Sequence, residues 1–440
     1  RTTSMIDKIL SPKYSYYLSL PGTWLYLLAA VGALITGYNL TEEKPAIGFI
    51  LLAYLPLLII PSIRVNLPLS LSYSMVVTAH CLVSLTNVYW YTFPGAELDP
   101  LTFHITATNL VEQGLDLPSG IGTNTYISIL MHMYELLGPS LLLGQQLSVI
   151  VSAIAVLVFW KLLIVLGVED EKYQALGITI AGLLPSVLLF GSLTLREPFE
   201  LIFLIVGTTA VVISLQRHSL TWLSAGIIAF ILMGLFHQIL LITGIGLATL
   251  SMACYAVKYS DQNKKQLLIV MVGAILVACI GLLIITVLPA LKGNNYLYVF
   301  GKGFMQSVVW YRSEVDTGVP RTAYGFDVTM ESPYIFTFGI IRSWLTYNLG
   351  PLPGMLTNLS GWVLTGEALV RVLGIAVMIL LMIRRTATSW FPILVFLILT
   401  IVWSVGTTNF GQALRHHTMT GWIPVVYLIV WLQSRRTSPA

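Results

Sequence analysis

The sequence predicts an all-helical membrane protein, and two observations lead to that prediction. Of the 440 residues, 56% are hydrophobic and only 10% are charged, whereas about a quarter of the residues in soluble globular domains are charged. The mean hydropathy is +0.84, and the apolar residues gather into runs long enough to cross a bilayer as helices. We therefore expect a polytopic helix bundle. Because the formal charge is only +4, we do not expect the chain to bind nucleic acid.

Apolar runs of roughly 17 to 25 residues mark about twelve predicted spans. Their limits are 23–40, 46–63, 68–93, 139–166, 174–193, 199–215, 219–235, 239–257, 267–289, 362–383, 389–406 and 418–433. The apolar run from 219 to 257 is too long for one helix, and the pair His237 and Gln238 near its middle predicts a tight hairpin. The polar start before Pro21 does not follow the plan of a cleavable signal peptide.

The spans divide the chain into five segments. Residues 1–93 hold three N-terminal spans, 94–138 form a first loop with two amphipathic helices, and 139–291 hold the central spans. Residues 292–361 form a second loop with a re-entrant or surface element, and 362–440 hold three C-terminal spans.

The lysines and arginines predict the orientation of these segments, because cytoplasmic loops carry an excess of both. With the N-terminus in the cytoplasm, the inner loops hold Lys8, Lys13, Arg64, Lys172, Arg217, Lys258, Lys264, Lys265, Arg384, Arg385, Arg435 and Arg436. Both termini then lie in the cytoplasm, and both long loops lie outside.

The first outer loop is acidic. Between Glu97 and Gly138 it carries seven Asp, Glu and His side chains but no Lys or Arg. Two runs of apolar residues at helical spacing predict helices that lie on the membrane surface. Asp99 stands directly before Pro100, so it is a candidate helix cap as well as a candidate catalytic group. Glu97 lacks the capping explanation.

Most cations predicted to lie outside are arginines, whose planar fork of donors suits phosphate. They are Arg196, Arg312, Arg321, Arg342 and Arg415, with Arg371 inside a span. An ordinary ion pair is the competing interpretation for Arg196, which precedes Glu197, and for Arg371, which follows Glu367 by four residues. By contrast, Arg415, His416 and His417 form a cationic cluster without an adjacent carboxylate.

Other kinds of site are not indicated. The three cysteines each fall in apolar runs, so neither a disulfide framework nor a cysteine zinc site is expected. A phosphate-binding GxxxxGK loop is absent, and no dinucleotide fingerprint follows a strand. We therefore expect no soluble nucleotide cofactor.

Several short motifs carry a resemblance to a known family. ELDP from Glu97, two surface helices and then GPSLLLGQQLSV from Gly138 resemble the first luminal loop of the GT-C superfamily of integral-membrane glycosyltransferases. LPSVLLFGSLTLRE from Leu184, GPLP from Gly350 and NFGQALRH from Asn409 resemble stretches of bacterial polysaccharide polymerase-like membrane proteins. The resemblance covers residues 90–430 as an arrangement.

The resemblance implies an activity and a place for it. GT-C enzymes transfer a sugar from a polyprenyl-phosphate or polyprenyl-diphosphate donor to a glycan or lipid-linked acceptor. For this chain it implies transfer, or polymerisation, with inversion at the anomeric carbon. The expected location is a bacterial cytoplasmic (inner) membrane, with the site on its extracytoplasmic face.

The resemblance also implies roles for particular residues. Asp99 is the first candidate for the general base and Glu97 the second. The candidate phosphate ligands of the donor are Arg196, Arg415 and His416, followed by Arg312, Arg342 and His237.

Some superfamily members use a divalent cation, so metal dependence stays open. Asp99, Glu97, Asp316 and Asp327 could supply its oxygen ligands, although their spacing is not diagnostic.

Three alternatives keep the membrane fold but change the function. An O-antigen ligase-type glycan transferase would also use Arg and His in outer loops. A lipid-linked oligosaccharide flippase would need cations distributed through the depth of the bundle. A secondary transporter would place its site near the midplane, often between two repeats, and no repeat is seen in this sequence.

Overall fold

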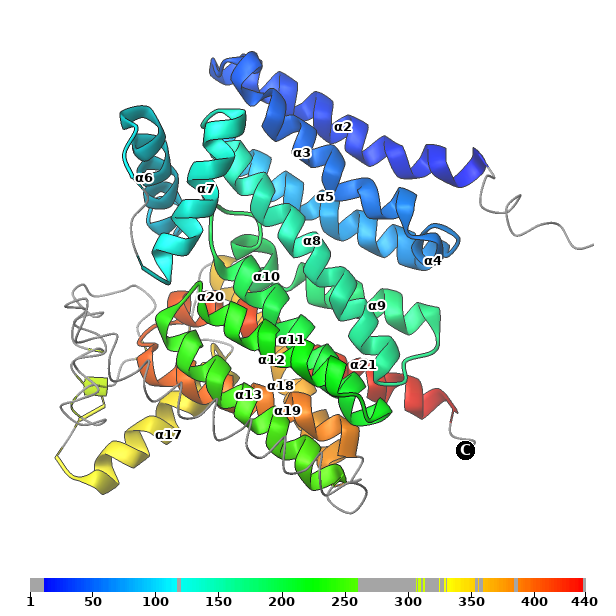
Figure 1. Cartoon of the computed structure of the whole chain (residues 1–440), viewed down its shortest axis with the longest axis vertical. Helices are drawn as coiled ribbons and strands as arrows, with labels where there is room; N and C mark the ends of the chain where they lie inside the picture. Colours follow the sequence, from blue (N-terminus) through cyan, green and yellow to red (C-terminus); the bar gives the residue numbers. More distant parts are fainter. Residues whose placement is uncertain are drawn as a thin grey trace, which may run out of the picture. The chain divides into compact units, whose positions relative to one another are not determined.

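The computed structural model confirms an all-helical chain. It describes residues 12–116, 120–259, 306, 308–309, 312, 324, 328–329, 331–352, 355, 359–383 and 387–437. Within these residues the chain forms 17 helices and no β-strand (Figure 1).

The described helices confirm a multi-pass membrane protein. Five are long and apolar enough to cross a bilayer: Leu67–Tyr89, Leu141–Val165, Glu197–Arg217, Gln238–Tyr259 and Gly361–Met382. Shorter apolar helices lie at Pro21–Thr36, Leu220–Gly234 and Trp390–Gly406. A bundle of about twelve spans stays a prediction, and the predicted span 267–289 lies outside the described residues.

The chain divides into two compact units. Unit 1 comprises Arg1–Ile205, Leu235–His237 and Ile429–Ala440, and unit 2 comprises Val206–Gly234 and Gln238–Leu428.

Unit 1 is built around α5. Its helices are α2 (Pro12–Thr36), α3 (Leu40–Ile59), α4 (Pro61–Arg64), α5 (Leu67–Tyr89), α6 (Asp99–Gln113), α7 (Thr123–Leu137), α8 (Leu141–Val165), α9 (Glu171–Leu183), α10 (Pro185–Phe190) and the start of α11 (Glu197–Arg217). Helix α5 packs against α2, α8 and α9, while α6 and α7 pack against one another. The two helices expected in the 94–138 loop are therefore present as α6 and α7.

Polar side chains fix where the helices of unit 1 begin. Asn66 caps α5, Ser140 caps α8 and Asp170 caps α9, each by accepting a hydrogen bond from a backbone N–H in the first turn. Such caps satisfy donors that have no partner within the helix.

One predicted span of unit 1 is broken. The predicted helix 174–193 ends at Leu183, and a short second helix starts at Pro185, because proline cannot donate to the preceding turn. Buried side chains bind the carbonyls around the break: His80 Nε2–H donates to Gly182 O at 3.1 Å, and Ser152 donates to Gly191 O at 3.1 Å. An irregular backbone is tolerated at membrane depth when side chains satisfy it in this way.

Unit 2 contains the helices of the second half of the chain. They are α12 (Leu220–Gly234), α13 (Gln238–Tyr259), α17 (Pro333–Leu349), α18 (Leu359–Met382), α19 (Ala387–Gly406), α20 (Phe410–Thr420), the end of α11 and the start of α21 (Trp422–Thr437). Helices α12 and α13 pack closely because Gly244 lies directly against the carbonyl of Phe230, where no Cβ would fit. The helix boundary at Gln238 agrees with the predicted hairpin.

Two hydrogen bonds within unit 1 each join segments that are predicted to lie on the same side of the membrane. Gly122 N donates to Leu235 O at 2.7 Å, which joins the first outer loop to the predicted hairpin tip. At the opposite end, Asp170 N donates to Gln433 Oε1 at 3.0 Å, which joins two predicted cytoplasmic segments. These contacts agree with the predicted sidedness. We call the end that contains Gly122 the outer end of unit 1, and its orientation in the membrane stays a prediction.

Candidate functional site

The candidate site residues fall in both units. Unit 1 contains Glu97, Asp99, Arg196 and His237, and unit 2 contains Arg312, Arg342, Arg415 and His416. The predicted convergence of Asp99 with Arg415 joins the two units and stays a prediction.

The candidate base lies at the start of α6. Asp99 is the first residue of the helix and is partly buried, while Glu97 is exposed. Leu98 occupies the capping position and makes no side-chain cap bond, so the interpretation of Asp99 as the cap is wrong. In the first turn the carboxylate of Asp99 instead lies at the positive end of the helix dipole.

A histidine and a tyrosine join α6 to α7. His104 Nδ1 lies 2.9 Å from the hydroxyl of Tyr134, and the two rings meet edge to face at 5.5 Å. Burial lowers the pKa of His104 to about 4. At neutral pH the imidazole is therefore uncharged.

A buried carboxylate that the sequence interpretation missed lies at the same end of unit 1. Glu43 is 3% exposed, and Ser140 Oγ donates to its two carboxylate oxygens at 3.1 and 3.0 Å. The hydroxyl of Tyr89 lies 3.4 Å from the carboxylate. Burial raises the pKa of Glu43, and the bonds from Ser140 and Tyr89 oppose that rise. The available signal was an acidic residue between two predicted spans, together with a serine suited to capping the span at 139.

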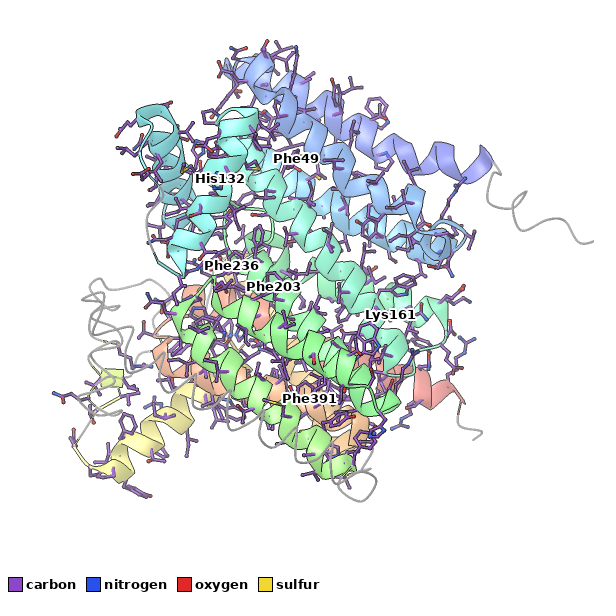
Figure 2. All side chains as sticks on the ribbon, in the orientation of Figure 1. Phe49, His132, Lys161, Phe203, Phe236 and Phe391 are labelled. Carbon is purple, nitrogen blue, oxygen red and sulfur yellow. The ribbon has the colours of Figure 1, made fainter. Side chains whose placement is uncertain are left out.

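Arg196 is held by side chains of unit 1. Its Nη1 donates to Thr123 Oγ1 at 2.7 Å, and its Nε lies 3.4 Å from Glu200 Oε1. The ion pair thus involves Glu200, one turn beyond the Glu197 suggested by the sequence. Nearby, Phe203 and Phe236 stack with ring centroids 6.0 Å apart, just before the candidate His237 (Figure 2).

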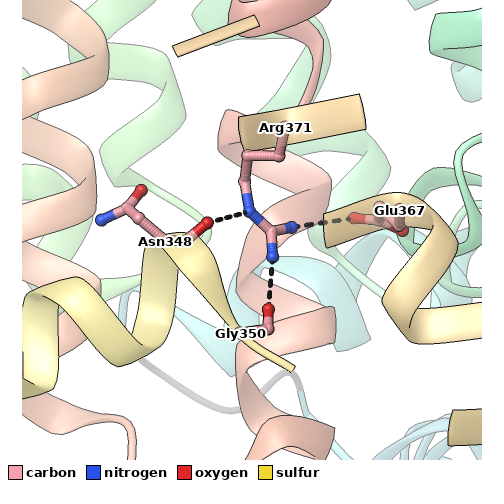
Figure 3. Close-up of polar contacts among 4 residues, drawn as sticks. All are labelled: Asn348, Gly350, Glu367 and Arg371. Atoms are coloured by element: carbon pink, nitrogen blue, oxygen red, sulfur yellow. Dashed lines mark hydrogen bonds and ion pairs between the residues drawn. The ribbon is translucent and has the colours of Figure 1, made fainter. Parts of the chain in front are cut away.

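In unit 2 a buried arginine binds the end of a helix. Arg371 Nε donates to Asn348 O at 2.7 Å, and Nη2 donates to Gly350 O at 2.7 Å (Figure 3). The predicted pair with Glu367 is present, at 3.5 Å. The carbonyls in the last turn of a helix lack partners within it, so Arg371 satisfies the end of α17 as well as pairing with Glu367.

A second buried arginine does the same for α19. Arg312 is 5% exposed, and its Nη1 donates to Val405 O at 3.2 Å, to Thr407 O at 3.1 Å and to Ser343 Oγ at 3.3 Å. Since α19 ends at Gly406, two of these partners are carbonyls at its C-terminal end. Arg342, by contrast, lies exposed on α17.

Two histidines of α20 lie beside these arginines. His416 Nδ1 lies 2.9 Å from Thr407 Oγ1, and its ring stacks on Trp403 with centroids 4.0 Å apart. The ring of His417 is buried 4.2 Å from that of Tyr347. The pKa of His417 is lowered by burial first, and then by the positive charges of Arg371 and His416. We call Arg312, Arg371, Arg415, His416 and His417 the cation cluster.

A small cavity adjoins the cation cluster. It is lined by Gly350, Pro351, Leu364, Glu367, Arg371, Phe410, Ala413, Leu414 and His417. Its volume is about 10 Å³, which accommodates roughly one water molecule. A sugar phosphate does not fit inside it.

No group of three metal-ligating side chains occurs among the described residues. Asp316 and Asp327, two of the candidate oxygen ligands, lie outside those residues, as does Arg321.

Comparison of the chain with protein-family models, with curated proteins and with solved structures finds no match in any of the three.

Proposed function

We propose that this chain is a membrane glycosyltransferase or polysaccharide polymerase. It would move a sugar from a polyprenyl-phosphate or polyprenyl-diphosphate donor onto an acceptor hydroxyl at the extracytoplasmic face. The observation that best supports the proposal is the cation cluster. The cluster comprises three arginines and two histidines of unit 2, and Glu367 pairs with Arg371.

The electrostatics of the cation cluster suit an anionic leaving group. The pKa of His417 is lowered first by burial and then by the positive charges of Arg371 and His416, so charged donors lie close to this uncharged ring. When the bond from the sugar to a lipid phosphate breaks, negative charge grows on the departing phosphate. Donors fixed in advance stabilise that charge more in the transition state than in the bound donor.

Different cations are suited to different roles. Arg312 and Arg371 are occupied by helix carbonyls, so we assign them to holding the shape of the cluster. Arg415 and His416 are only partly buried, and we assign the phosphate to them. His237 and Arg196, in unit 1, stay candidate phosphate ligands from the sequence.

Asp99 is the proposed general base. Its carboxylate would take the proton of the acceptor hydroxyl while the hydroxyl oxygen bonds to the anomeric carbon. The bond from that carbon to the phosphate oxygen breaks at the same time, and the phosphate departs with the electron pair. One such displacement inverts the anomeric configuration.

The test is transfer by the purified full-length chain in nanodiscs, supplied with polyprenyl-linked sugar donors and glycan acceptors. Asp99→Asn should abolish transfer and leave donor binding intact. Arg415→Ala should weaken both. Arg64→Ala, at the predicted cytoplasmic end of unit 1, is the matched control and should change neither.

Normal turnover by Asp99→Asn would remove the proposed base. Donor binding and lipid translocation without transfer in the wild-type chain would favour a flippase over a transferase. Transfer of a whole preassembled glycan would favour the ligase-type reaction.

A further inference from the structure

The hydroxyl of Tyr134 is fixed in position by a glycine. Tyr134 is 1% exposed, and a Cβ atom added at Gly144 on α8 would lie 2.6 Å from its hydroxyl oxygen and 2.9 Å from Thr194 Cγ2. The hydroxyl therefore rests against the backbone of α8, with no room to turn toward it. The one hydrogen-bond partner recorded for this hydroxyl among the described residues is Nδ1 of His104.

This contact determines which ring nitrogen of His104 carries the proton. A buried phenolic O–H needs an acceptor, and leaving it without one is costly. Nδ1 serves as that acceptor only if it carries no hydrogen. In the neutral ring the hydrogen is then on Nε2.

The Nε2 side of the ring is accessible. His104 is only partly buried, and its Nε2 is not among the buried, unpartnered polar atoms of the described chain. Since burial lowers the pKa of His104 to about 4, the ring presents this N–H donor without a charge at neutral pH.

The proposed base stands on the same helix. Asp99 precedes His104 by five residues in α6, which corresponds to about 7.5 Å along the helix axis and about 140° around it. One end of α6 therefore carries a hydrogen-bond acceptor and a fixed neutral donor. A neutral donor suits a hydroxyl or ring oxygen, whereas phosphate is better matched by charged partners.

We infer that His104 is a positioning residue that donates from Nε2–H to an oxygen of the acceptor sugar and so orients it toward Asp99. The substrate part of this inference rests on the proposed function. The state of the ring, set by Tyr134 and Gly144, does not.

Two substitutions separate positioning from a merely structural role. The side-chain amide of Gln places its NH2 group near the position of Nε2, and the amide of Asn occupies that of Nδ1. His104→Gln thus keeps the donor toward substrate and gives up the contact with Tyr134. His104→Asn keeps the contact with Tyr134 and gives up the donor.

The two roles predict opposite results in acceptor kinetics with the full-length chain in nanodiscs. If His104 positions the sugar, His104→Asn raises the acceptor KM roughly tenfold, as expected for one lost hydrogen bond. His104→Gln stays within about threefold of wild type, and the donor KM is unchanged in both. If His104 only joins α6 to α7, His104→Gln is the impaired variant, and the inference is overturned.

A second measurement does not depend on turnover. The ¹⁵N shifts of histidine-labelled full-length protein, assigned by the signal missing in His104→Gln, should show a bare Nδ1 and a protonated Nε2. A protonated Nδ1 overturns the inference even in an active enzyme. If wild type transfers no sugar, the proposed function fails alone. Titration with methyl glycosides then decides: a shift of the His104 Nε2 signal supports positioning, and an unchanged signal overturns it.

Discussion

Unit 1 buries carboxylates, whereas unit 2 buries two arginines together with one carboxylate, Glu367. The direction of the helices explains this difference. In unit 1 the buried carboxylates lie at helix N-termini: Glu43 binds the capping Ser140 of α8, and Glu197 and Glu200 lie in the first turn of α11. In unit 2 the buried arginines lie at helix C-termini, where Arg371 binds the end of α17 and Arg312 the end of α19. Helix N-termini favour anions and C-termini favour cations.

In both units the buried charged side chains are bonded to other groups of the protein. Their first role is therefore structural, and any contact with a substrate is secondary. In the sequence Arg371 stands out inside an apolar span and Arg312 as an arginine of the second loop, yet both donate to backbone carbonyls. Removing such residues tests the fold first. The proposed catalytic roles are therefore better tested at the partly buried Asp99, His104 and Arg415.

The largest effect is expected at Arg371. Arg371→Ala removes the ion pair of the buried Glu367 and the donor to two carbonyls at the end of α17, so unfolding should become easier by about 3–5 kcal/mol. The measurement is thermal melting of the full chain in detergent, with the exposed Arg342→Ala on α17 as control. A melting temperature equal to that of the control would show that the helix end does not need Arg371.

A smaller loss is expected at Gly144. Gly144→Ala inserts a methyl group against Tyr134 and Thr194, and such overpacking costs about 1–3 kcal/mol. The matched control is Gly246→Ala on α13, where an added Cβ meets nothing within 4 Å. The control should stabilise slightly, since Ala favours helix over Gly by about 1 kcal/mol. Equal melting temperatures for the two variants would contradict the close contact with Tyr134.

The carboxylate of Glu43 should make the stability of the folded chain depend on pH. Its folded pKa is raised above 4.5, so the unfolded chain loses this proton at lower pH than the folded chain does. Stability therefore falls as the pH rises from about 4.5 through the folded pKa. Glu43→Gln should remove this contribution and flatten the melting temperature across that window, whereas a curve parallel to wild type would show that Glu43 is not its source.

The smallest effect is expected at the exposed pair of His132 and Glu135. Their side chains approach to 3.0 Å but are 60% and 44% exposed, and exposed pairs on one helix contribute about 0.3–0.5 kcal/mol or less. His132→Ala should leave the melting temperature and transfer nearly unchanged. A large loss of either would reveal a role for this face of α7 that its exposure does not suggest.

Local patterns in the sequence were enough to predict the helices near the candidate base. The apolar spacing in the first loop predicted α6 and α7, and the pair at His237 and Gln238 marked the hairpin between α12 and α13. Both features depend on neighbouring residues. The break at Pro185 was also readable as a proline signal, but the surrounding apolar run concealed it.

The contacts of the candidate site could not be predicted in the same way. Ser140 meets Glu43 from 97 residues away, and Arg312 reaches Thr407 across 95. No local periodicity encodes such partners. The contact of His104 likewise depends on Tyr134, 30 residues further along.

The absence of a side chain at position 144 has a chemical consequence at position 104. Because Gly144 has no Cβ atom, the hydroxyl of Tyr134 packs directly against α8. The proton of that hydroxyl then determines which nitrogen of His104 accepts a hydrogen bond and which donates one. The protonation of His104 in α6 thus depends on packing between α7 and α8. A larger residue at 144 would displace the Tyr134 hydroxyl and so change which nitrogen of His104 carries the hydrogen, although it would touch no reacting atom.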